Sequence, residues 1–489
     1  MRGPILKLLS ASGYAAVLGY LGMLILVRLY PKESFGLFDF VISVVGIFTP
    51  FVSLRYEDSL MLVEKDRDGA HSFLLASGVT IVLSLLLFLM LPFRTEIAVF
   101  FNDPLIAHWL WVIPVILVIV RFAKFSDLWL TRHERFGRVS IGQMSYSTTM
   151  TGIKIGGGIL SNSPAGLVFG YMLGVITGIL VNARIVLRGL SVALDGGVSM
   201  SLIKYLAGRY RRFPIYTMPA AVVAMLGTRL PFLLILYYFS LETLGLFGRA
   251  FAVVFVPLSL IGAAVAQVFF VRGVEARRSG TIPFITDTIH KRLVFLSWFP
   301  TVVVVIAGPD IFEFLLGETW RMSGTIARYI APWILFSAIA SPLSRLFDVL
   351  ERQRLELLTN AGLFIVVAAA LVYGGSREDL FLTMLLLGVG GGLVRIWQIT
   401  VLLSIAGLTR RSFLKPYLRY ALYSLPWLLI VAAAVIWTSP LVVTMTAALG
   451  GLAYVASVVF REGLLDIREQ PSATDDETNT NDIEEAPDE

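Results

Sequence analysis

The chain has no cysteine, few histidines and little charge. Among its 489 residues there is no cysteine, so thiol catalysis, iron-sulfur clusters and disulfides are excluded. Charged residues make up 15% of the chain, against about a quarter in soluble domains. The chain has only four scattered histidines, His71, His108, His133 and His290. So few potential ligands argue against a metal centre, and we expect no cofactor.

Long apolar runs are abundant instead. The chain is 57% hydrophobic with a mean hydropathy of +0.80, and about 20 apolar residues suffice to cross a bilayer as a helix. The sequence therefore predicts an all-α polytopic membrane protein with about fourteen transmembrane helices. The predicted spans are 8–29, 37–60, 70–92, 105–127, 141–160, 165–186, 215–238, 243–270, 290–308, 325–347, 357–374, 380–404, 417–438 and 440–460.

These spans divide the chain into five parts. Residues 1–190 form a first lobe of six helices, 191–214 a cytoplasmic linker, and 215–404 a second lobe of six helices. Residues 405–460 add two C-terminal helices, and 461–489 form a disordered acidic tail in the cytoplasm. An even number of spans places both termini on one side of the membrane.

The positive charge supports that orientation. The net charge is +6, and about thirty of the 40 lysines and arginines fall on the side that also carries both termini. Only four lie in the opposite loops: Lys32, Arg94, Arg321 and Arg377. Because positive residues are retained on the cytoplasmic side, both termini should be cytoplasmic in a plasma (inner) membrane protein. This use of positive charge gives no reason to expect nucleic acid as a partner.

A short repeat relates the two predicted lobes. Residues 33–38 read ESFGLF and residues 242–247 read ETLGLF, with an offset of 209. Both stretches occupy the same place in the order of spans, and six spans separate them. The two lobes should therefore be related by a pseudo-two-fold axis along the membrane normal.

The loops favour a carrier over an enzyme. The longest predicted external loop, 309–324, is too short to hold a glycan acceptor, which disfavours a membrane glycan polymerase or ligase. No G-x-x-x-x-G-K-[ST] phosphate loop is present, so ATP coupling within the chain is not expected. No Ser/His/Asp arrangement suggests a catalytic residue, and we predict no enzymatic activity.

Several charged residues lie within predicted spans, where they are costly and usually functional. The sharper interpretation is that five of these cations line one cavity and attract an anionic cargo such as a phosphate. The five are Arg55, Lys154, Arg229, Arg249 and Arg395. The alternatives are that such side chains reach the interface, or that Arg55 pairs with Glu57 or Asp58. Asp39 could couple transport to an ion gradient or merely neutralise a neighbouring arginine.

Several stretches resemble the polysaccharide transport branch of the multidrug/oligosaccharidyl-lipid/polysaccharide (MOP) exporters, which includes Wzx-type flippases of O-antigen and exopolysaccharide pathways. The resemblance covers about residues 8–460 and includes 53-SLRYEDSLMLVEKDRDGA-70, 130-LTRHERFGRVSI-141, 209-RYRRFPIYTMPAAVVAMLGTRLPFLLI-235, 245-GLFGRAFAVVFVPLSLIGAAVAQVFF-270 and 316-LGETWRMSGTIARYIAPW-333. It implies two six-helix lobes in a V around a cationic cavity.

The resemblance also implies a function. The cargo would be an undecaprenyl-diphosphate-linked oligosaccharide, moved by alternating access and driven by a proton or sodium gradient. Other expected partners are membrane lipids and the polysaccharide polymerase and export machinery. The two C-terminal helices would form a groove for the lipid tail. A lipid II flippase and a multidrug antiporter of the same fold remain rivals, although an antiporter for cationic drugs should have an acidic cavity.

Overall fold

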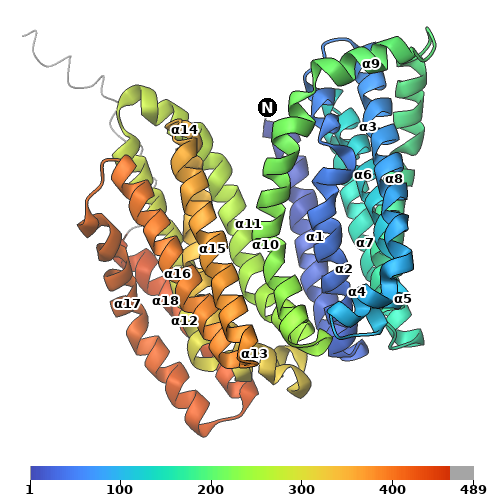
Figure 1. Ribbon diagram of the computed structural model, residues 1–489. Coiled ribbons are helices and arrows are strands. Elements are labelled where there is room, and N and C mark those ends of the chain that lie inside the picture. The colour runs from blue at the N-terminus through green and yellow to red at the C-terminus, as the bar shows by residue number, and fades with distance from the viewer. Residues whose placement is uncertain (1, 463–489) are drawn as a thin grey trace, which may run out of the picture.

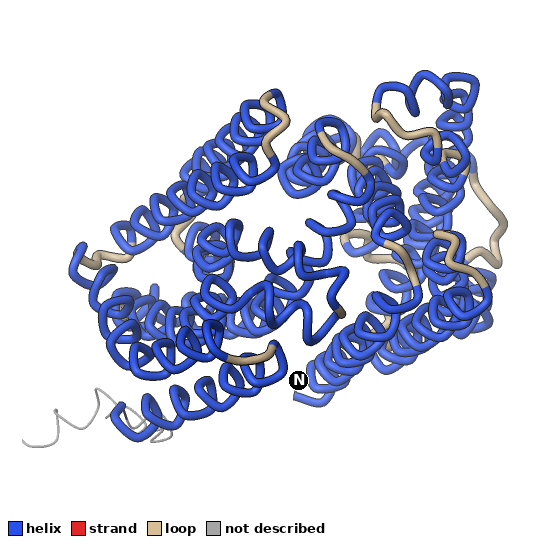
Figure 2. The backbone as a smooth tube through the Cα atoms, turned by 90° about the horizontal axis from the view of Figure 1, so that it is seen from below, coloured by secondary structure: helices blue, strands red, loops and turns tan. Residues whose placement is uncertain are grey.

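The computed structural model describes residues 2–462, and within them every regular element is a helix. The predicted acidic tail, 461–489, lies almost wholly outside the described residues. Figure 1 shows two groups of helices that lie close together at one end of the molecule and diverge toward the other. Viewed along that axis, the two groups remain distinct (Figure 2).

The first lobe contains the helices up to residue 193. Its long helices are α1 (Arg2–Leu29), α2 (Lys32–Ser53), α3 (Asp66–Leu86), α6 (Val112–Arg132), α7 (Phe136–Leu160) and α8 (Ala165–Ala193). Short helices connect them: η1 (Tyr56–Met61), η2 (Leu87–Phe93), α4 (Arg94–Phe100) and α5 (Leu105–Trp109). Helix α9 (Met200–Arg209) and the π-helical turn η3 (Phe213–Thr217) then lead into the second lobe.

The second lobe is built from six further long helices. They are α10 (Met218–Tyr238), α11 (Leu241–Ser279), α12 (Ile282–Leu316), α13 (Arg321–Leu343), α15 (Gln353–Ser376) and α16 (Leu380–Ile405), with the short η4 (Glu318–Trp320) and α14 (Arg345–Val349) between them. The last two helices, α17 (Arg410–Trp437) and α18 (Pro440–Glu462), pack together against α12. This arrangement confirms the predicted fold class.

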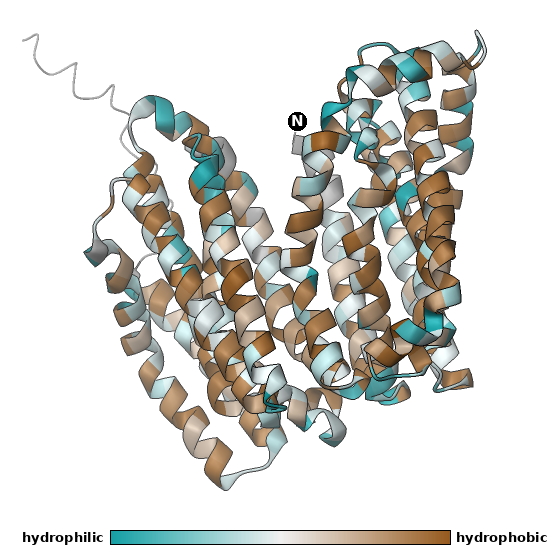
Figure 3. Ribbon diagram, viewed as in Figure 1, coloured by the Kyte–Doolittle hydropathy of each residue, from teal (hydrophilic) through white to brown (hydrophobic). Residues whose placement is uncertain are grey.

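Twelve of the helical segments in the described chain are long and apolar enough to cross a membrane. Helices α6 and α7 correspond to the other two predicted spans, but they are more polar: α6 carries four charged residues in 21 positions. The predicted total of fourteen is therefore close to, but not confirmed by, the number of apolar helices. Figure 3 shows hydrophobic residues along the middle of both lobes and hydrophilic ones gathered toward α9 and α14.

The predicted repeat is visible in the helix boundaries. Helices α1 and α10 end at Leu29 and Tyr238, and helices α2 and α11 begin at Lys32 and Leu241. Both pairs are separated by 209 residues, the offset of the sequence repeat. The two lobes therefore use equivalent helices, and those helices face each other across the lobe boundary.

The lobes touch along these helices and at the connections next to them. Tyr20 of α1 donates a hydrogen bond to the Ala252 carbonyl of α11 over 3.1 Å, and Lys32 pairs with Glu242 at 2.8 Å. The buried indole of Trp320 donates to the Val27 carbonyl over 3.0 Å. The end with short connections is thus closed, whereas α9 and α14 lie at the end where the lobes diverge (Figure 1).

Candidate functional site

Helix α2 carries the first part of the site at this lobe boundary. The helix starts after Pro31 and continues through the repeat motif to Asp39, two turns further on. Gly248 of α11 faces this carboxylate, and a Cβ there would overlap Asp39 Oδ2. The absence of a side chain at Gly248 therefore lets the Asp39 carboxylate approach the second lobe.

Arg249, the next residue of α11, binds that carboxylate. Its Nη2 lies 3.0 Å from Asp39 Oδ1 and 3.1 Å from Oδ2. Both side chains are about 12% exposed, so this is a buried ion pair between the two lobes. The Arg249 guanidinium also lies 4.5 Å above the ring of Phe35, a cation-π contact that further holds it against α2.

Lys154 approaches the same place from α7. The residue is 7% exposed, and a Cβ at Gly170 of α8 would collide with its stem, so that glycine makes room for it. Its Nζ lies 4.1 Å from the ring centroid of Phe38, which neighbours Asp39. Within the described chain, no carboxylate lies within 4.0 Å of this ammonium group.

Arg229 of α10 is the third cation. It packs across Gly46 of α2, where an added Cβ would lie 3.2 Å from Arg229 Nε. Arg229, Lys154 and Arg249 are all within electrostatic range of the Asp39 carboxylate. We call these four residues the Asp39 cluster. It contains three cations and one anion, so two positive charges are left unmatched.

The other two predicted cations lie elsewhere. Arg55 follows α2 with a left-handed backbone (φ 60°) and pairs with Asp58 at 3.0 Å, one of the alternatives that the sequence left open. Arg395 lies on α16 of the second lobe and donates a hydrogen bond to Gln398. The structure thus brings together three of the five predicted cations around Asp39, and cargo binding by any of the five stays a prediction.

One buried ion pair was missed by the sequence analysis. Arg121 of α6 pairs with Glu57 of η1, and the two side chains are 5% and 1% exposed. Arg121 lies within the predicted span 105–127, so it could have been singled out in the same way as Lys154. Because its partner lies on η1 of the same lobe, this arginine forms an ion pair inside the first lobe.

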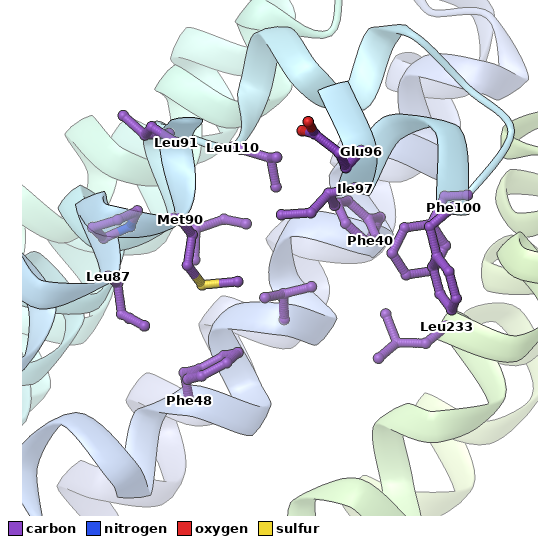
Figure 4. A pocket seen from close by; sticks show the side chains of 14 residues that line it. Phe40, Phe48, Leu87, Met90, Leu91, Glu96, Ile97, Phe100, Leu110 and Leu233 are labelled. Atoms are coloured by element: carbon purple, nitrogen blue, oxygen red, sulfur yellow. The ribbon is translucent and has the colours of Figure 1, made fainter. Parts of the chain in front are cut away.

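An apolar cavity of about 420 Å³ lies on another face of α2 (Figure 4). Phe40, Val44 and Phe48, spaced one turn apart on α2, line it together with residues of η2, α4 and α6 and Leu233 of α10. Glu96 is the one charged residue of its lining. Helix α2 therefore presents a carboxylate to the Asp39 cluster and aromatic rings to this cavity.

The described residues offer no obvious metal site. In the part of the chain between residues 2 and 462, no group of three or more histidines, aspartates or glutamates could hold a metal ion. The Asp39 cluster itself, with three basic side chains around one carboxylate, can attract an anion electrostatically next to an apolar cavity.

Comparison with known proteins places this geometry in a class. A solved structure of the lipid II flippase MurJ in an inward closed conformation superimposes with a TM-score of 0.74 at 14% identity, covering 93% of this chain and 98% of that one. An inward-facing multidrug resistance MATE family transporter of the MOP superfamily gives 0.58 at 12% identity, covering 80% and 95%. These likenesses define a multi-pass membrane protein with the MOP transporter fold.

The family follows from a separate comparison. A family model described as "Polysaccharide biosynthesis protein" matches residues 25–324, and the chain belongs to this family. A search of curated proteins gave no match. The resemblance to the polysaccharide branch of the MOP exporters is confirmed, and the family and fold are those of transporters.

Proposed function

We propose that this protein is a flippase that carries an undecaprenyl-diphosphate-linked oligosaccharide from the cytoplasmic to the outer face of the plasma (inner) membrane. It would act by alternating access in polysaccharide, O-antigen or exopolysaccharide biosynthesis, without forming or breaking covalent bonds. The observation that carries the proposal is the gathering of Lys154, Arg229 and Arg249 around Asp39, where the two lobes meet.

The charge of the Asp39 cluster suits a diphosphate. Ionised groups at bilayer depth are costly unless they have partners, yet two of the three cations have no countercharge within the cluster. A diphosphate that joins a lipid to a sugar carries a negative charge on each phosphate, and arginine and lysine bind such oxygens strongly. The same balance disfavours a cationic drug as cargo.

The apolar cavity beside α2 suits the other end of the cargo. An isoprenoid chain has no hydrogen-bonding groups, and only one charged residue lines this cavity of about 420 Å³ (Figure 4). A further apolar cavity of about 360 Å³ lies between α12 and α18, on one of the two helices expected to form a tail groove. An amphiphilic cargo could thus keep its tail in apolar surroundings while its head meets the cluster.

The orientation belongs to the proposal as well. The basic connections lie at the end where the lobes diverge, so that end, with both chain termini, would face the cytoplasm. The closed end would face outward. Asp39 would contribute to ion coupling if its protonation freed Arg249, although its pairing with Arg249 agrees equally with a neutralising role.

Transport into vesicles tests the proposal. The purified protein would be reconstituted with an undecaprenyl-diphosphate-linked oligosaccharide, and the fraction of cargo reaching the opposite leaflet would be measured with and without a proton or sodium gradient. We expect Lys154→Ala and Arg229→Ala to reduce transport at unchanged expression. Arg328→Ala is the matched control, because within the described chain Arg328 donates to the Ile306 carbonyl, outside the cluster.

The outcomes separate the rivals. Full activity of both cluster variants would remove them from the cargo site. Movement of lipid II in preference to the oligosaccharide, in the same vesicles, would favour a lipid II flippase, whose fold the chain shares. In cells, loss of viability on deletion would favour that rival, and loss of surface polysaccharide would favour our proposal.

A further inference from the structure

A buried histidine fastens the connection between the lobes to the first lobe. His71 lies in the second turn of α3 and is fully buried. Its Nε2 lies 3.0 Å from the backbone nitrogen of Ser199, the residue that precedes α9. Its Nδ1 lies 2.7 Å from the carbonyl oxygen of Arg67, one turn earlier on α3. The imidazole ring thus joins α3 to the start of α9.

These two partners determine which ring nitrogen carries the proton. A backbone N–H can only donate, so Nε2 of His71 must accept the bond from Ser199 and carry no hydrogen. A carbonyl oxygen can only accept, so Nδ1 must donate to Arg67. His71 is therefore a neutral imidazole with one tautomer. A second proton on Nε2 would place two donors against each other, so a protonated ring and the contact with Ser199 exclude each other.

Ser199 is also the residue that caps α9. Its Oγ accepts a hydrogen bond from a backbone N–H of the first turn over 3.3 Å. Further along α9, Leu206 is 1% exposed within the core of the first lobe. Tyr56 of η1 donates to the Ala207 carbonyl over 3.2 Å. His71 and Tyr56 therefore hold the two ends of α9 on the first lobe.

Fastening α9 shortens the free connection between the lobes. Helix α9 lies across the end of the first lobe, at the end where the lobes diverge (Figure 1). While it is held there, residues 211–217, which include the π-helical turn η3, join it to α10 of the second lobe. If α9 is released, the free connection extends back to the end of α8 at Ala193. The attachment of α9 therefore limits how far the lobes can separate at this end.

No carboxylate is placed to favour a protonated His71. Among the histidines within residues 2–462, only His133 has a carboxylate within 4.0 Å, that of Asp66. Asp68 lies on the same helix as His71 but beyond that distance. The carboxylates on the elements next to α3 are paired, line another cavity or are exposed: Glu57 pairs with Arg121, Asp58 pairs with Arg55, Asp127 lines a cavity between α6, α7 and α8, and Glu64 and Asp195 are exposed.

The other charged groups on these elements are cations. Arg67 lies against the linker, 3.7 Å from the position of a Cβ added at Gly196, and Arg132 of α6 lies against Gly69 of α3. Further cations are Lys124 of α6, Arg184 and Arg188 of α8, and Lys204 and Arg209 of α9. A protonated His71 would therefore find no countercharge in place of the lost bond, whereas water would reach it once α9 moved away.

We infer that His71 is a pH-sensitive latch: the neutral ring holds α9 on the first lobe, and protonation of the ring releases it. Histidine is the side chain that ordinarily changes charge between about pH 5 and 8. Because only the released state can take up the proton, the latched state is favoured at high pH and is lost as the pH falls. That the latch senses the cytoplasm rests on the orientation in the proposed function, whereas the release itself does not.

Hydrogen exchange at several pH values tests the latch. Protection factors, which correct each rate for intrinsic exchange at the same pH, would be measured by mass spectrometry for residues 199–210 of the full chain in detergent. In wild-type protein this protection should fall between about pH 8 and pH 5, by up to about tenfold per pH unit. Helix α13, Arg321–Leu343, is the internal reference: its unchanged protection would exclude general unfolding in acid.

Three variants make the test specific to His71. His71→Gln keeps an oxygen that can accept from Ser199 and does not titrate, so protection should become independent of pH. His71→Ala removes the acceptor, so residues 199–210 should lose protection at every pH. His133→Gln is the matched control: His133 lies at the same end of the lobe, but its ring nitrogens meet Trp129 and Asp66, so the pH dependence should remain.

The possible results separate the latch from the proposed function. Equal protection at every pH in wild-type protein would overturn the latch. A full pH dependence in His71→Gln would assign the release to another group, and unchanged protection in His71→Ala would show that the ring does not hold α9. These results leave the flippase proposal standing. Conversely, a wild-type protein that moves no lipid-linked oligosaccharide but loses protection in acid would keep the latch and refute the flippase.

Discussion

Gly36 of α2 and Gly245 of α11 occupy equivalent positions in the two halves of the chain. Each glycine lies against the start of the helix that carries the other one. A Cβ at Gly36 would overlap the Leu241 carbonyl oxygen, and a Cβ at Gly245 would overlap the Lys32 carbonyl oxygen. Lys32 and Leu241 are themselves the first residues of α2 and α11. The sequence repeat thus forms a reciprocal contact that closes the lobes at one end.

Adding one methyl group at either glycine should open this contact. We expect Gly36→Ala and Gly245→Ala to cost about 1–3 kcal/mol each through overpacking, and to have similar effects because the contact is reciprocal. Gly152→Ala is the control, because nothing lies within 4 Å of a Cβ at that position of α7.

Cross-linking with a short bis-maleimide measures that opening. The chain has no cysteine, so Lys32→Cys with Glu242→Cys provides a single reporter pair where the two long side chains meet at 2.8 Å. Cross-linking should be efficient in the protein that carries only the two cysteines and in the Gly152→Ala background. It should be clearly weaker in the Gly36→Ala and Gly245→Ala backgrounds. Equal cross-linking in all backgrounds would contradict the role of the glycines.

Removing the carboxylate of Asp39 should destabilise the protein. Asp39→Asn leaves the buried guanidinium of Arg249 without its countercharge, which should cost about 3 kcal/mol. The loss would appear as a lower midpoint of thermal unfolding in detergent. The double variant Asp39→Asn with Arg249→Gln should recover part of it, and additive losses would argue against a coupled pair.

The buried pair of the first lobe allows a comparison with a partly exposed one. Arg121→Leu leaves Glu57 buried and unpaired, so we expect a loss of about 3–5 kcal/mol. Arg55→Leu breaks an ion pair whose side chains are 34% and 29% exposed, and it should cost less than about 1 kcal/mol. Unfolding midpoints of the two variants would be compared, and a larger effect at Arg55 would contradict this order.

The proposed orientation can be tested with single cysteines. Thr319 lies exposed near the closed end, and Gly208 lies exposed on α9 near the opposite end. A membrane-impermeant maleimide added to intact cells should label Thr319→Cys and spare Gly208→Cys. The reverse pattern would place both chain termini outside.

The sequence predicted the helices well because hydropathy reports membrane burial directly. It could not predict where α2 ends. The predicted span 37–60 includes the mixed stretch 54-LRYEDSL-60, whereas α2 stops at Ser53 because Leu54 and Arg55 both adopt positive φ (49° and 60°). Local backbone geometry of this kind leaves no trace in a hydropathy profile.

The grouping of the charged side chains was predicted in part, whereas their role stays a prediction. Their position within spans singled out Lys154, Arg229 and Arg249, which the structure gathers around one carboxylate. Depth does not report the direction in which a side chain points. Arg395 also lies deep in its span, but it donates to Gln398 within its own lobe, because the rotation of each helix is determined by packing against its neighbours.

Helix α11 is unusually long. Its 39 residues span about 58 Å, well beyond the roughly 30 Å of hydrocarbon. Arg249 lies near one end, and at the other Arg277 donates to the Val349 carbonyl over 2.7 Å. In the proposed transport cycle, a tilt of α11 at its Arg249 end would therefore move α14, at the opposite surface, by a larger amount, and Pro257 would be the point where the helix can bend.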